Sequence, residues 1–346
     1  MAPVLHPPLV PDPMDAPGIR WGILAPGGIA GAFAAAVREG TRSTVVAVGS
    51  RRRSRAEAFA AAHGVGTAYG SYAELVQDDR VDAVYIASPH SEHRTHALLA
   101  LGAGRPVLVE KAFTRNLAEA DEVLTAGRSA GLLVAEAMWS RYLPHYDVVR
   151  RTVAAGELGD LVLVEAAHGQ ALWPDGPQRL ADPALAGGSL LDLGVYPISF
   201  LDMVLGPLQD VRVSGALTDL GVDASAHLLA RSGSGAFAGA WSTMAASADC
   251  TAQVVGTRAR LELDHRFYAP TTVRLVAPDG ALVDEHRPAG GVHGFAYEAA
   301  EFARVMAAGG LEPESVPHEA TRRVMALLDS ARADLGVVYP GETGRG

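Results

Sequence analysis

The stretch IRWGILAPGGIA, residues 19–30, decides the fold of this chain. It joins a short apolar run to a turn of small residues, and an Ala-rich segment follows. A strand that enters a helix through such a turn lets the backbone approach a pyrophosphate, which binds N–H groups at the helix N-terminus. Ala25 stands at the first glycine position of the dinucleotide fingerprint, Gly27 at the second and Ala30 at the last. The turn alone is a weak signal, because many strand-to-helix connections carry one.

The segments around this turn strengthen the prediction. Apolar runs alternate with helical segments from Ile19 to about Glu136, the runs being IRWGILA, TVVAVGS, VDAVYIA, RPVLVE and GLLVAEA. Continuous apolar strands separated by helices are typical of a parallel sheet that is covered on both faces. We therefore predict a doubly wound α/β sheet, a Rossmann domain, with the turn at the start of its first βαβ unit.

The second half of the chain has a different pattern. LVLVEAAHG, VRVSGAL, ASAHLLA, GAFAGAWST, TAQVVGT, ARLELD and TTVRLVA predict strands with few helices between them, and SGSG at 232–235 predicts a turn between two of them. Two amphipathic helices, GFAYEAAEFARVMAAGG and HEATRRVMALLDSARADLG, follow. This half is predicted to be an α+β domain with a large, mostly antiparallel sheet.

These patterns divide the chain into three predicted segments. Residues 1–18 are proline-rich, lack the features of a signal peptide and are expected to form a flexible extension. Residues 19–138 are expected to form the dinucleotide-binding domain, and residues 139–346 the substrate-binding and oligomerisation domain. A wide antiparallel sheet needs a cover on its outer face. We therefore expect a homodimer or higher homo-oligomer through the C-terminal sheet.

The composition is that of an acidic globular protein. The 346 residues include 29 Lys and Arg against 39 Asp and Glu, a formal net charge of −10. Such a chain has no general attraction to nucleic acid or to an anionic membrane surface. The longest charge-free stretches contain many Gly and Ser and are interpreted as too weakly apolar to cross a bilayer, so a cytoplasmic protein is expected. Cys250, the only cysteine, lies in an apolar stretch and is predicted to be a buried thiol.

The end of the second predicted strand indicates which cofactor the domain binds. An acid is expected there when the ligand is NAD, because it accepts hydrogen bonds from the ribose. This chain instead has Ser50 and Arg51 in the run GSRRRSR, which includes Arg55. A hydroxyl and guanidinium groups can bind a 2′-phosphate, so NADP is favoured over NAD. The alternative is that the arginines are a solvated helix start, although cations at a helix N-terminus are slightly unfavourable.

Two further segments contain residues suited to acid–base chemistry. Glu110 and Lys111 end a predicted parallel strand, at the edge where open α/β sheets bind ligands. Asp192 and Tyr196 are four residues apart in GGSLLDLGVYP, and Pro197 predicts a kink or a helix restart there. A tyrosine near a lysine can exchange protons with an alcohol, because the ammonium lowers the pKa of the phenol. The alternatives are a lysine extended into solvent and a core tyrosine capped by an aspartate.

Together these segments resemble the Gfo/Idh/MocA family of oxidoreductases, and within it the branch of the dimeric dihydrodiol dehydrogenase and the NADP-dependent D-xylose dehydrogenase. The matching segments are WGILAPGGIA, IASPHSEHRTHALLAL, VEKAF, EAMWSRYLP, LADPALAGGSLLDLGVYP and VMALLDSARADLGVVYP. They extend from about Ile19 to Pro340, nearly the whole chain. The resemblance implies an NADP-dependent dehydrogenase that moves hydride to or from a CH–OH carbon of a sugar, an inositol-like ring or a trans-dihydrodiol.

The resemblance also implies roles for single residues. Lys111 and Tyr196 would be the catalytic pair, with Tyr196 exchanging the hydroxyl proton and Lys111 tuning it, and Asp192 would orient the substrate or support Tyr196. The residues expected to line the substrate pocket are Trp139, Arg141 and, with weaker support, Arg179. Those expected to bind the cofactor are Ala25, Gly27, Gly28, Ile29, Ser50, Arg51, Arg55, Ser88, Pro89, His90, His93 and Glu110, with Pro89, His90 and His93 beside the nicotinamide ribose. No metal is expected, because hydride transfer with a Lys–Tyr pair needs none.

Two positions depart from the family pattern. Ala25 adds a Cβ to the pyrophosphate turn, which we expect to be tolerated. Ala112 replaces the proline after the lysine, and Lys111 is therefore expected to be held less rigidly. Two other functions stay open: a nucleotide-binding sensor without turnover, and an enzyme that uses tightly held nicotinamide for transient oxidation during glycoside cleavage. The loop at 265–270, where Arg266 and Tyr268 could touch a ligand, does not reveal the substrate.

Overall fold

The computed structural model describes residues 3–291 and 293–342, which form two compact units. The parallel-sheet unit contains residues 11–142, 290–291 and 293–322. The mixed-sheet unit contains residues 3–10, 143–289 and 323–342. The domain bounds given by the sequence remain predictions, because these units reflect the density of contacts and not the ability of a segment to fold alone.

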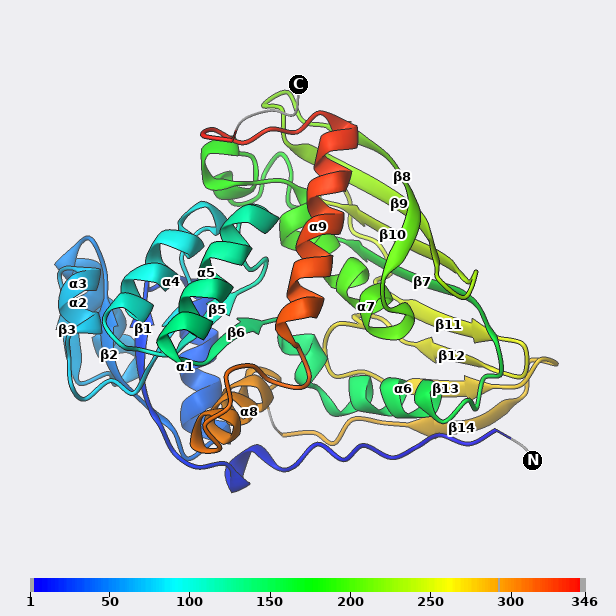
Figure 1. Cartoon of the computed structure of the whole chain (residues 1–346), viewed down its shortest axis with the longest axis horizontal. Coiled ribbons are helices and arrows are strands. Elements are labelled where there is room, and N and C mark those ends of the chain that lie inside the picture. Colours follow the sequence, from blue (N-terminus) through cyan, green and yellow to red (C-terminus); the bar gives the residue numbers. More distant parts are fainter. Residues whose placement is uncertain (1–2, 292, 343–346) are drawn as a thin grey trace. The chain divides into compact units, whose positions relative to one another are not determined.

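The parallel-sheet unit is built on six parallel strands in the order β3-β2-β1-β4-β5-β6 (Figure 1). The strands are β1 (Arg20–Leu24), β2 (Thr44–Gly49), β3 (Thr67–Tyr69), β4 (Ala83–Ile86), β5 (Val107–Glu110) and β6 (Val134–Ala137). This is the strand order of the Rossmann fold, which reverses between β1 and β4. The predicted doubly wound parallel sheet is therefore confirmed.

Helices cover both faces of this sheet. They are α1 (Gly28–Gly40), α2 (Arg53–His63), α3 (Tyr72–Val76), α4 (His93–Gly102), α5 (Leu117–Ala130) and α8 (Phe295–Ala307). On one face Phe33 of α1 stacks on Tyr85 of β4 at 3.8 Å between ring centroids, and Trp21 of β1 contacts Phe302 of α8 at 4.9 Å. These rings are fully or almost fully buried and make the aromatic centre of this core.

The mixed-sheet unit contains eight strands in the order β14-β13-β12-β11-β7-β10-β9-β8 (Figure 1). They are β7 (Leu161–Gly169), β8 (Leu208–Leu217), β9 (Asp223–Ser232), β10 (Phe237–Thr243), β11 (Ala252–Gly256), β12 (Arg260–Leu263), β13 (Val273–Val276) and β14 (Leu282–His286). Only the β7–β10 pair is parallel. In β9, Leu228 and Ala230 are buried while Leu229 and Arg231 are exposed. This alternation leaves one face of the sheet open, and it confirms the predicted, mostly antiparallel sheet.

The inner face of the mixed sheet is covered by α6 (Pro144–Ala154), α7 (Val195–Leu205) and the C-terminal part of α9 (His318–Leu335). A π-helical turn, Leu190–Gly194, leads directly into α7. Pro197 therefore lies in the first turn of a new helix, as the sequence predicts. The segment Pro183–Leu205 is long and apolar enough to span a membrane, contrary to the interpretation of the sequence. However, 89% of its most apolar window is buried inside the protein, so it belongs to the core.

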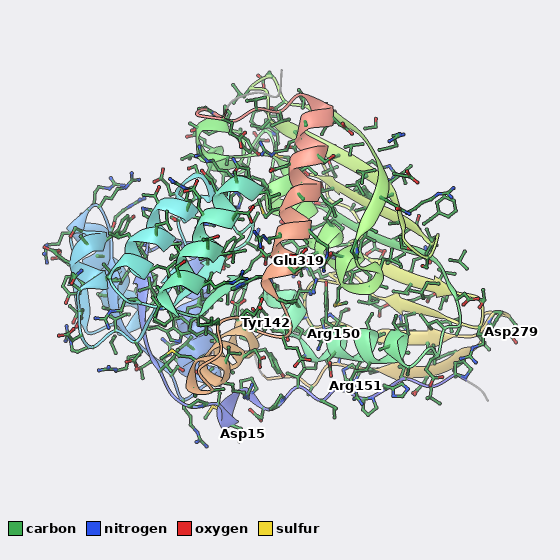
Figure 2. All side chains as sticks on the ribbon, viewed as in Figure 1. Asp15, Tyr142, Arg150, Arg151, Asp279 and Glu319 are labelled. Atoms are coloured by element: carbon green, nitrogen blue, oxygen red, sulfur yellow. The ribbon has the colours of Figure 1, made fainter. Side chains whose placement is uncertain are left out.

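The N-terminal residues of the mixed-sheet unit follow α6. The backbone N–H groups of Val4, His6 and Leu9 donate to Glu157 Oε2 at 3.3 Å, Thr152 Oγ1 at 3.1 Å and Asp147 Oδ2 at 2.7 Å, respectively. Arg150 and Arg151 lie on α6 (Figure 2). Arg151 donates to the carbonyl oxygen of Pro7, and Arg150 pairs with Asp147. A segment interpreted from its proline content as flexible thus has specific hydrogen-bond partners.

Candidate functional site

The turn after β1 presents open backbone N–H groups. Gly27 caps α1 without a side-chain hydrogen bond, and Gly27, Gly28 and Ile29 are exposed. A Cβ atom added at Gly27 or Gly28 would meet no atom within 4 Å, so there is room for a phosphate group at the first turn of α1. Ala25 has a φ of 73°, in the left-handed region that favours glycine. The site thus fits a dinucleotide pyrophosphate, and Ala25 is accommodated at the cost of local strain.

The end of β2 offers cations beside this turn. Ser50 is buried, and its hydroxyl accepts a hydrogen bond from the N–H of Arg52 at 3.3 Å. Arg51 and Arg55 are exposed and, within residues 3–291 and 293–342, neither forms an ion pair. Arg51 lies near Tyr72 and His96, and its charge acts on both groups. Burial raises the pKa of Tyr72, and the charge of Arg51 opposes this rise. Burial lowers the pKa of His96 to about 4, and the charge of Arg51 adds to this effect. The chemistry of this set fits a 2′-phosphate.

The histidine that begins α4 connects the ends of two strands. His93 is fully buried, its Nε2 contacts the carbonyl oxygen of Ser88 at 2.7 Å, and its Nδ1 contacts those of Ala112 and Phe113 at 3.0 and 3.2 Å. Ser88 is also held through its hydroxyl, which lies 2.9 Å from His96 Nδ1. His93 thus links the segment after β4 to the segment after β5, and its contact with the nicotinamide ribose remains a prediction. Pro89 and the buried His90 lie between these anchors.

The end of β5 places Glu110 and Lys111 at the carboxyl edge of the parallel sheet. The Glu110 carboxylate accepts hydrogen bonds from the Tyr85 phenol and from the backbone N–H of Lys111, the latter at 3.1 Å. Lys111 is partly exposed, and the Lys111–Ala112 peptide bond is cis. Ala112, which occupies the position of the family proline, is fully buried, and its carbonyl is one of the two that His93 holds. The His93 ring thus contacts the backbone directly after Lys111.

The two substrate-pocket candidates after β6 are also in the parallel-sheet unit. The Trp139 ring packs against Phe295 of α8 at 4.9 Å between centroids. Arg141 is buried, and its Nε donates to the carbonyl oxygen of Ser315 at 3.3 Å. The charge of Arg141 also counteracts the rise that burial causes in the pKa of Glu136, to about 7. Their contact with substrate remains a prediction.

In the mixed-sheet unit, the structure brings Asp192 and Arg179 together. Arg179 Nη1 lies 3.2 Å from Asp192 Oδ1, and Asp192 is part of the π-helical turn that precedes α7. Tyr196 is the second residue of α7 and is 8% exposed, as is Asp192. The three residues that the sequence selects in this half of the chain thus belong to one continuous element and its ion-pair partner.

Sequence reasoning missed two residues beside Tyr196 and only partly identified a third. The ring of His168, at the end of β7, stacks on that of Tyr268 at 4.2 Å, and both rings lie about 5 Å from that of Tyr196, at 5.3 and 5.0 Å. Gln170 Nε2 lies 2.8 Å from His168 Nε2 and 3.3 Å from the Tyr268 hydroxyl. Burial raises the pKa of Tyr268. The period-two pattern of LVLVEAAHG, which directs positions 164, 166 and 168 to one face, was the available signal for His168.

Two other expectations concern metal ligands and the cysteine. Among the described residues, no group of three or more His, Cys, Asp or Glu side chains is arranged to hold a metal ion. Cys250 is buried, as predicted, with its Sγ 3.4 Å from the carbonyl oxygen of Ala248. Burial raises the pKa of this thiol, which makes it a poor nucleophile.

Known proteins match the chain over most of its length. Trans-1,2-dihydrobenzene-1,2-diol dehydrogenases of Danio rerio and Bos taurus are 32% and 33% identical to it, over 93% of this chain and 98% of each relative. The crystal structure of KijD10, a 3-ketoreductase from Actinomadura kijaniata in complex with NADP and TDP-benzene, is similar with a TM-score of 0.80 and 28% identity, over 92% of this chain and 98% of that one. An aldose–aldose oxidoreductase from Caulobacter crescentus shares the fold, with a TM-score of 0.83 at 22% identity, over 92% and 98% of the two chains.

Family models agree with this similarity and with both units. Residues 19–138 match the oxidoreductase family with an NAD-binding Rossmann fold, and residues 146–262 match the GFO/IDH/MocA C-terminal domain. The two models together cover more than half of the chain. The protein is therefore an oxidoreductase with a dinucleotide-binding Rossmann fold, and it belongs to the Gfo/Idh/MocA family.

Proposed function

We propose that this chain transfers hydride between NADP(H) and the hydroxyl or carbonyl carbon of a sugar, an inositol-like ring or a trans-dihydrodiol. The observation that carries this proposal is the group around Tyr196: a phenol beside the Asp192–Arg179 ion pair and two flat rings. A phenol can exchange a proton with an alcohol oxygen, and the neighbouring groups can orient a polyol. Relatives named trans-1,2-dihydrobenzene-1,2-diol dehydrogenase and a structural neighbour named a 3-ketoreductase support a reaction at a hydroxyl or carbonyl carbon.

NADP is the proposed cofactor, and it would accept or donate the hydride. The residues proposed to hold it are Ala25, Gly27, Gly28 and Ile29 at the pyrophosphate, Ser50, Arg51 and Arg55 at the 2′-phosphate, and Ser88, Pro89, His90, His93 and Glu110 toward the nicotinamide end. Two features support NADP over NAD. The guanidinium groups of Arg51 and Arg55 are exposed and, within the described residues, not in ion pairs, and the KijD10 structure was solved with NADP.

Proton transfer is assigned to Tyr196, with Lys111 as the cation that tunes it. An ammonium favours the phenolate and lowers the pKa of the phenol toward neutral pH, which is what a general acid–base needs. Asp192 and Arg179 are proposed to position a hydroxyl group next to the reacting one. Trp139 and Arg141 are proposed to complete the substrate pocket.

The rings beside Tyr196 favour a cyclic substrate. His168 is buried and supports Tyr268 from one side, so the partly exposed Tyr268 ring offers a flat face on which the C–H side of a ring can lie, while the Gln170 amide offers a hydrogen-bond donor and an acceptor. A linear polyol would bind less tightly, because it would lose more conformational freedom on binding than a ring does.

The test is absorbance at the reduced-nicotinamide band with NADP or NAD, across aldoses, inositols and cyclic diols. We expect turnover of at least one ring substrate with NADP, and Tyr196→Phe should reduce it about a hundredfold while cofactor affinity changes less than about twofold. Tyr297→Phe, on α8, removes an equivalent hydroxyl and should leave turnover unchanged. Full activity in Tyr196→Phe would remove this residue from the mechanism. Glycoside cleavage without net cofactor reduction would instead favour the glycoside-cleaving enzyme. A bound cofactor that no substrate reduces or oxidises would favour the nucleotide-binding sensor.

A homodimer through the open face of the mixed sheet is also proposed. Leu229 and Phe237 on this face are 55% and 51% exposed and line a shallow hollow of about 290 Å³, and a second hollow, of about 470 Å³, includes His227 and Trp241. Apolar side chains of this size gain about 25 cal/mol per Å² when a second copy covers them. Light scattering should give twice the chain mass for the wild type, and Leu229→Glu should give the monomer. A wild-type monomer would refute the proposal. Cytoplasmic location remains a prediction.

A further inference from the structure

The turn that carries Asp192 is held by a carboxylate far away in the sequence. Asp223, the first residue of β9, is fully buried, and its Oδ2 accepts a hydrogen bond from the backbone N–H of Leu190 at 2.6 Å. Its other oxygen lies directly under Gly188, where an added Cβ would come within 2.3 Å of it. Gly188 has a φ of 115°, a conformation in which side chains are strained. The absence of a side chain at Gly188 therefore allows Asp223 to reach the first N–H of the π-helical turn.

A second anchor comes from the C-terminal segment. The Tyr339 hydroxyl, in a ring that is 1% exposed, donates to the carbonyl oxygen of Gly187 at 2.6 Å. The guanidinium of Arg332 lies 4.4 Å from the centre of the Tyr339 ring and pairs with Glu342 at 2.9 Å and Asp329 at 2.8 Å. The Tyr339 ring is thus itself held by the guanidinium of Arg332, which is fixed by its two ion pairs.

The strand β10 provides a third contact to the segment that carries Asp192. Ser189 Oγ donates to Ser242 Oγ at 2.8 Å, and a Cβ at Gly194 would lie 2.9 Å from the same hydroxyl oxygen. The segment 187–194 is therefore held by hydrogen bonds at its first, third and fourth positions, from side chains of β9, β10 and the chain that follows α9, and these side chains also pack closely against Gly188 and Gly194. None of these side chains belongs to the group around Tyr196.

We propose that Asp223, assisted by Tyr339, is a positioning residue that sets the turn Leu190–Gly194, and through it Asp192 and Tyr196, for the reaction. This inference rests on the proposed function for the identity of the reaction, and on the contacts above for the positioning. Because Asp192 is inside the turn and Tyr196 directly follows it, a rotation at Leu190 moves both side chains. Small displacements of reacting groups are costly, since about 1 Å can reduce turnover a hundredfold.

The charge of Asp223 gives this anchor a dependence on pH. Burial raises the pKa of Asp223 to about 7, against the opposing effects of the N–H groups of Leu190, Asp223 and Ser189 and the charge of Arg332. Tyr339 is a further titratable group that interacts with Asp223, and Arg332, Glu342 and Asp329 in turn interact with Tyr339. The residue of β8 that pairs with Asp223 is Leu217, which does not titrate. The carboxylate is the stronger acceptor for an N–H donor. The anchor is therefore tightest above neutral pH and weakens as the carboxyl gains its proton.

The test compares Asp223→Asn and Asp223→Ala with Asp147→Asn in the full-length protein. Asp147 is a matched control, because it is also buried in the mixed-sheet unit and also accepts a backbone N–H, that of Leu9. We expect Asp223→Asn to lower kcat about tenfold and Asp223→Ala about a hundredfold, with the NADP dissociation constant within about twofold of wild type. The rise of kcat with pH near 7 should be lost in Asp223→Asn. Asp147→Asn should keep kcat and the pH profile.

Hydrogen exchange of the peptide covering 187–196 separates this inference from the proposed function. Exchange should be faster in both Asp223 variants and unchanged in Asp147→Asn. If the wild type turns over no substrate but exchange accelerates, the proposed function fails and the anchor stands. Unchanged exchange together with unchanged kcat would overturn the positioning role. Should Asp223→Ala fail to fold, Tyr339→Phe replaces it, with faster exchange at 187–190 and about a threefold loss of kcat expected.

Discussion

Replacing Asp223 by Asn should make the protein more stable at pH 8 while it becomes less active. The ordinary pKa of an aspartate is 3.8, and burial raises that of Asp223 to about 7. Between these two values the folded state holds a proton that the unfolded state has released, so the free energy of unfolding falls as pH rises. The penalty is absent below about pH 4 and complete above about pH 7.

The size of the effect follows from the same two values. Each pH unit of difference corresponds to about 1.4 kcal/mol, so the full penalty is about 4 kcal/mol. Between pH 5 and pH 8, about two units of the interval are crossed, which gives a loss of about 3 kcal/mol in the wild type. Asparagine has no charge to lose and keeps an oxygen for the N–H of Leu190, so this share of the pH dependence should disappear in the variant.

The assay is urea unfolding of wild type and Asp223→Asn at pH 5 and pH 8, with the same protein concentration and salt. The difference in unfolding free energy between the two proteins should shift by about 3 kcal/mol toward the variant on going to pH 8. An equal pH dependence in both proteins would show that the carboxyl is ionised throughout, and that the buried environment assigned to it is wrong.

The remaining predictions concern the cofactor, the acid limit of stability and the strained turn. Arg51→Ala should weaken NADP binding about tenfold or more and leave NAD binding nearly unchanged, as measured by fluorescence titration, because one guanidinium contact to a phosphate is lost; Arg128→Ala, an exposed arginine on α5, should change neither, and equal losses for both cofactors would remove the assigned role. His145 is buried and its Nε2 contacts the carbonyl oxygen of Phe267, and burial lowers its pKa to about 4. Because the unfolded state then binds the proton more readily, wild type should lose up to about 3 kcal/mol between pH 6.5 and pH 4 that His145→Gln keeps, and parallel urea curves would contradict this. Ala25→Gly should raise the unfolding free energy by roughly 0.5–1 kcal/mol by relieving the positive φ, whereas Ala35→Gly inside α1 should lower it by about 1 kcal/mol; thermal unfolding that ranks them the other way would show that Ala25 is unstrained.

The sequence by itself determined the elements whose residues repeat with a clear period. The buried strands of the parallel sheet, the two C-terminal helices and the alternating strand β9 were predicted because their apolar positions reflect one local geometry. The elements β3, α3, α6 and β14 were missed. They are short or polar, so no clear period marks them, and they form through contacts with segments far away in the chain.

The same division applies to the candidate site. Lys111, Asp192 and Tyr196 could be selected from motifs, because a strand end and a double glycine are visible in one segment of sequence. The partners of these segments could not. The His93 ring contacts the carbonyl oxygen of Ala112, and the Tyr268 ring stacks on His168. The Asp223 carboxylate accepts a hydrogen bond from the backbone N–H of Leu190.

Each of these pairs joins residues separated by many positions, and no local pattern records them. The hydrogen bonds form only when strands that are distant in sequence lie next to one another, and burial then fixes both their strength and the pKa of the groups involved. The residues proposed for the chemistry can thus be selected from the sequence. Only the tertiary structure decides which side chains hold them in place, because those contacts exist only after the sheets have formed.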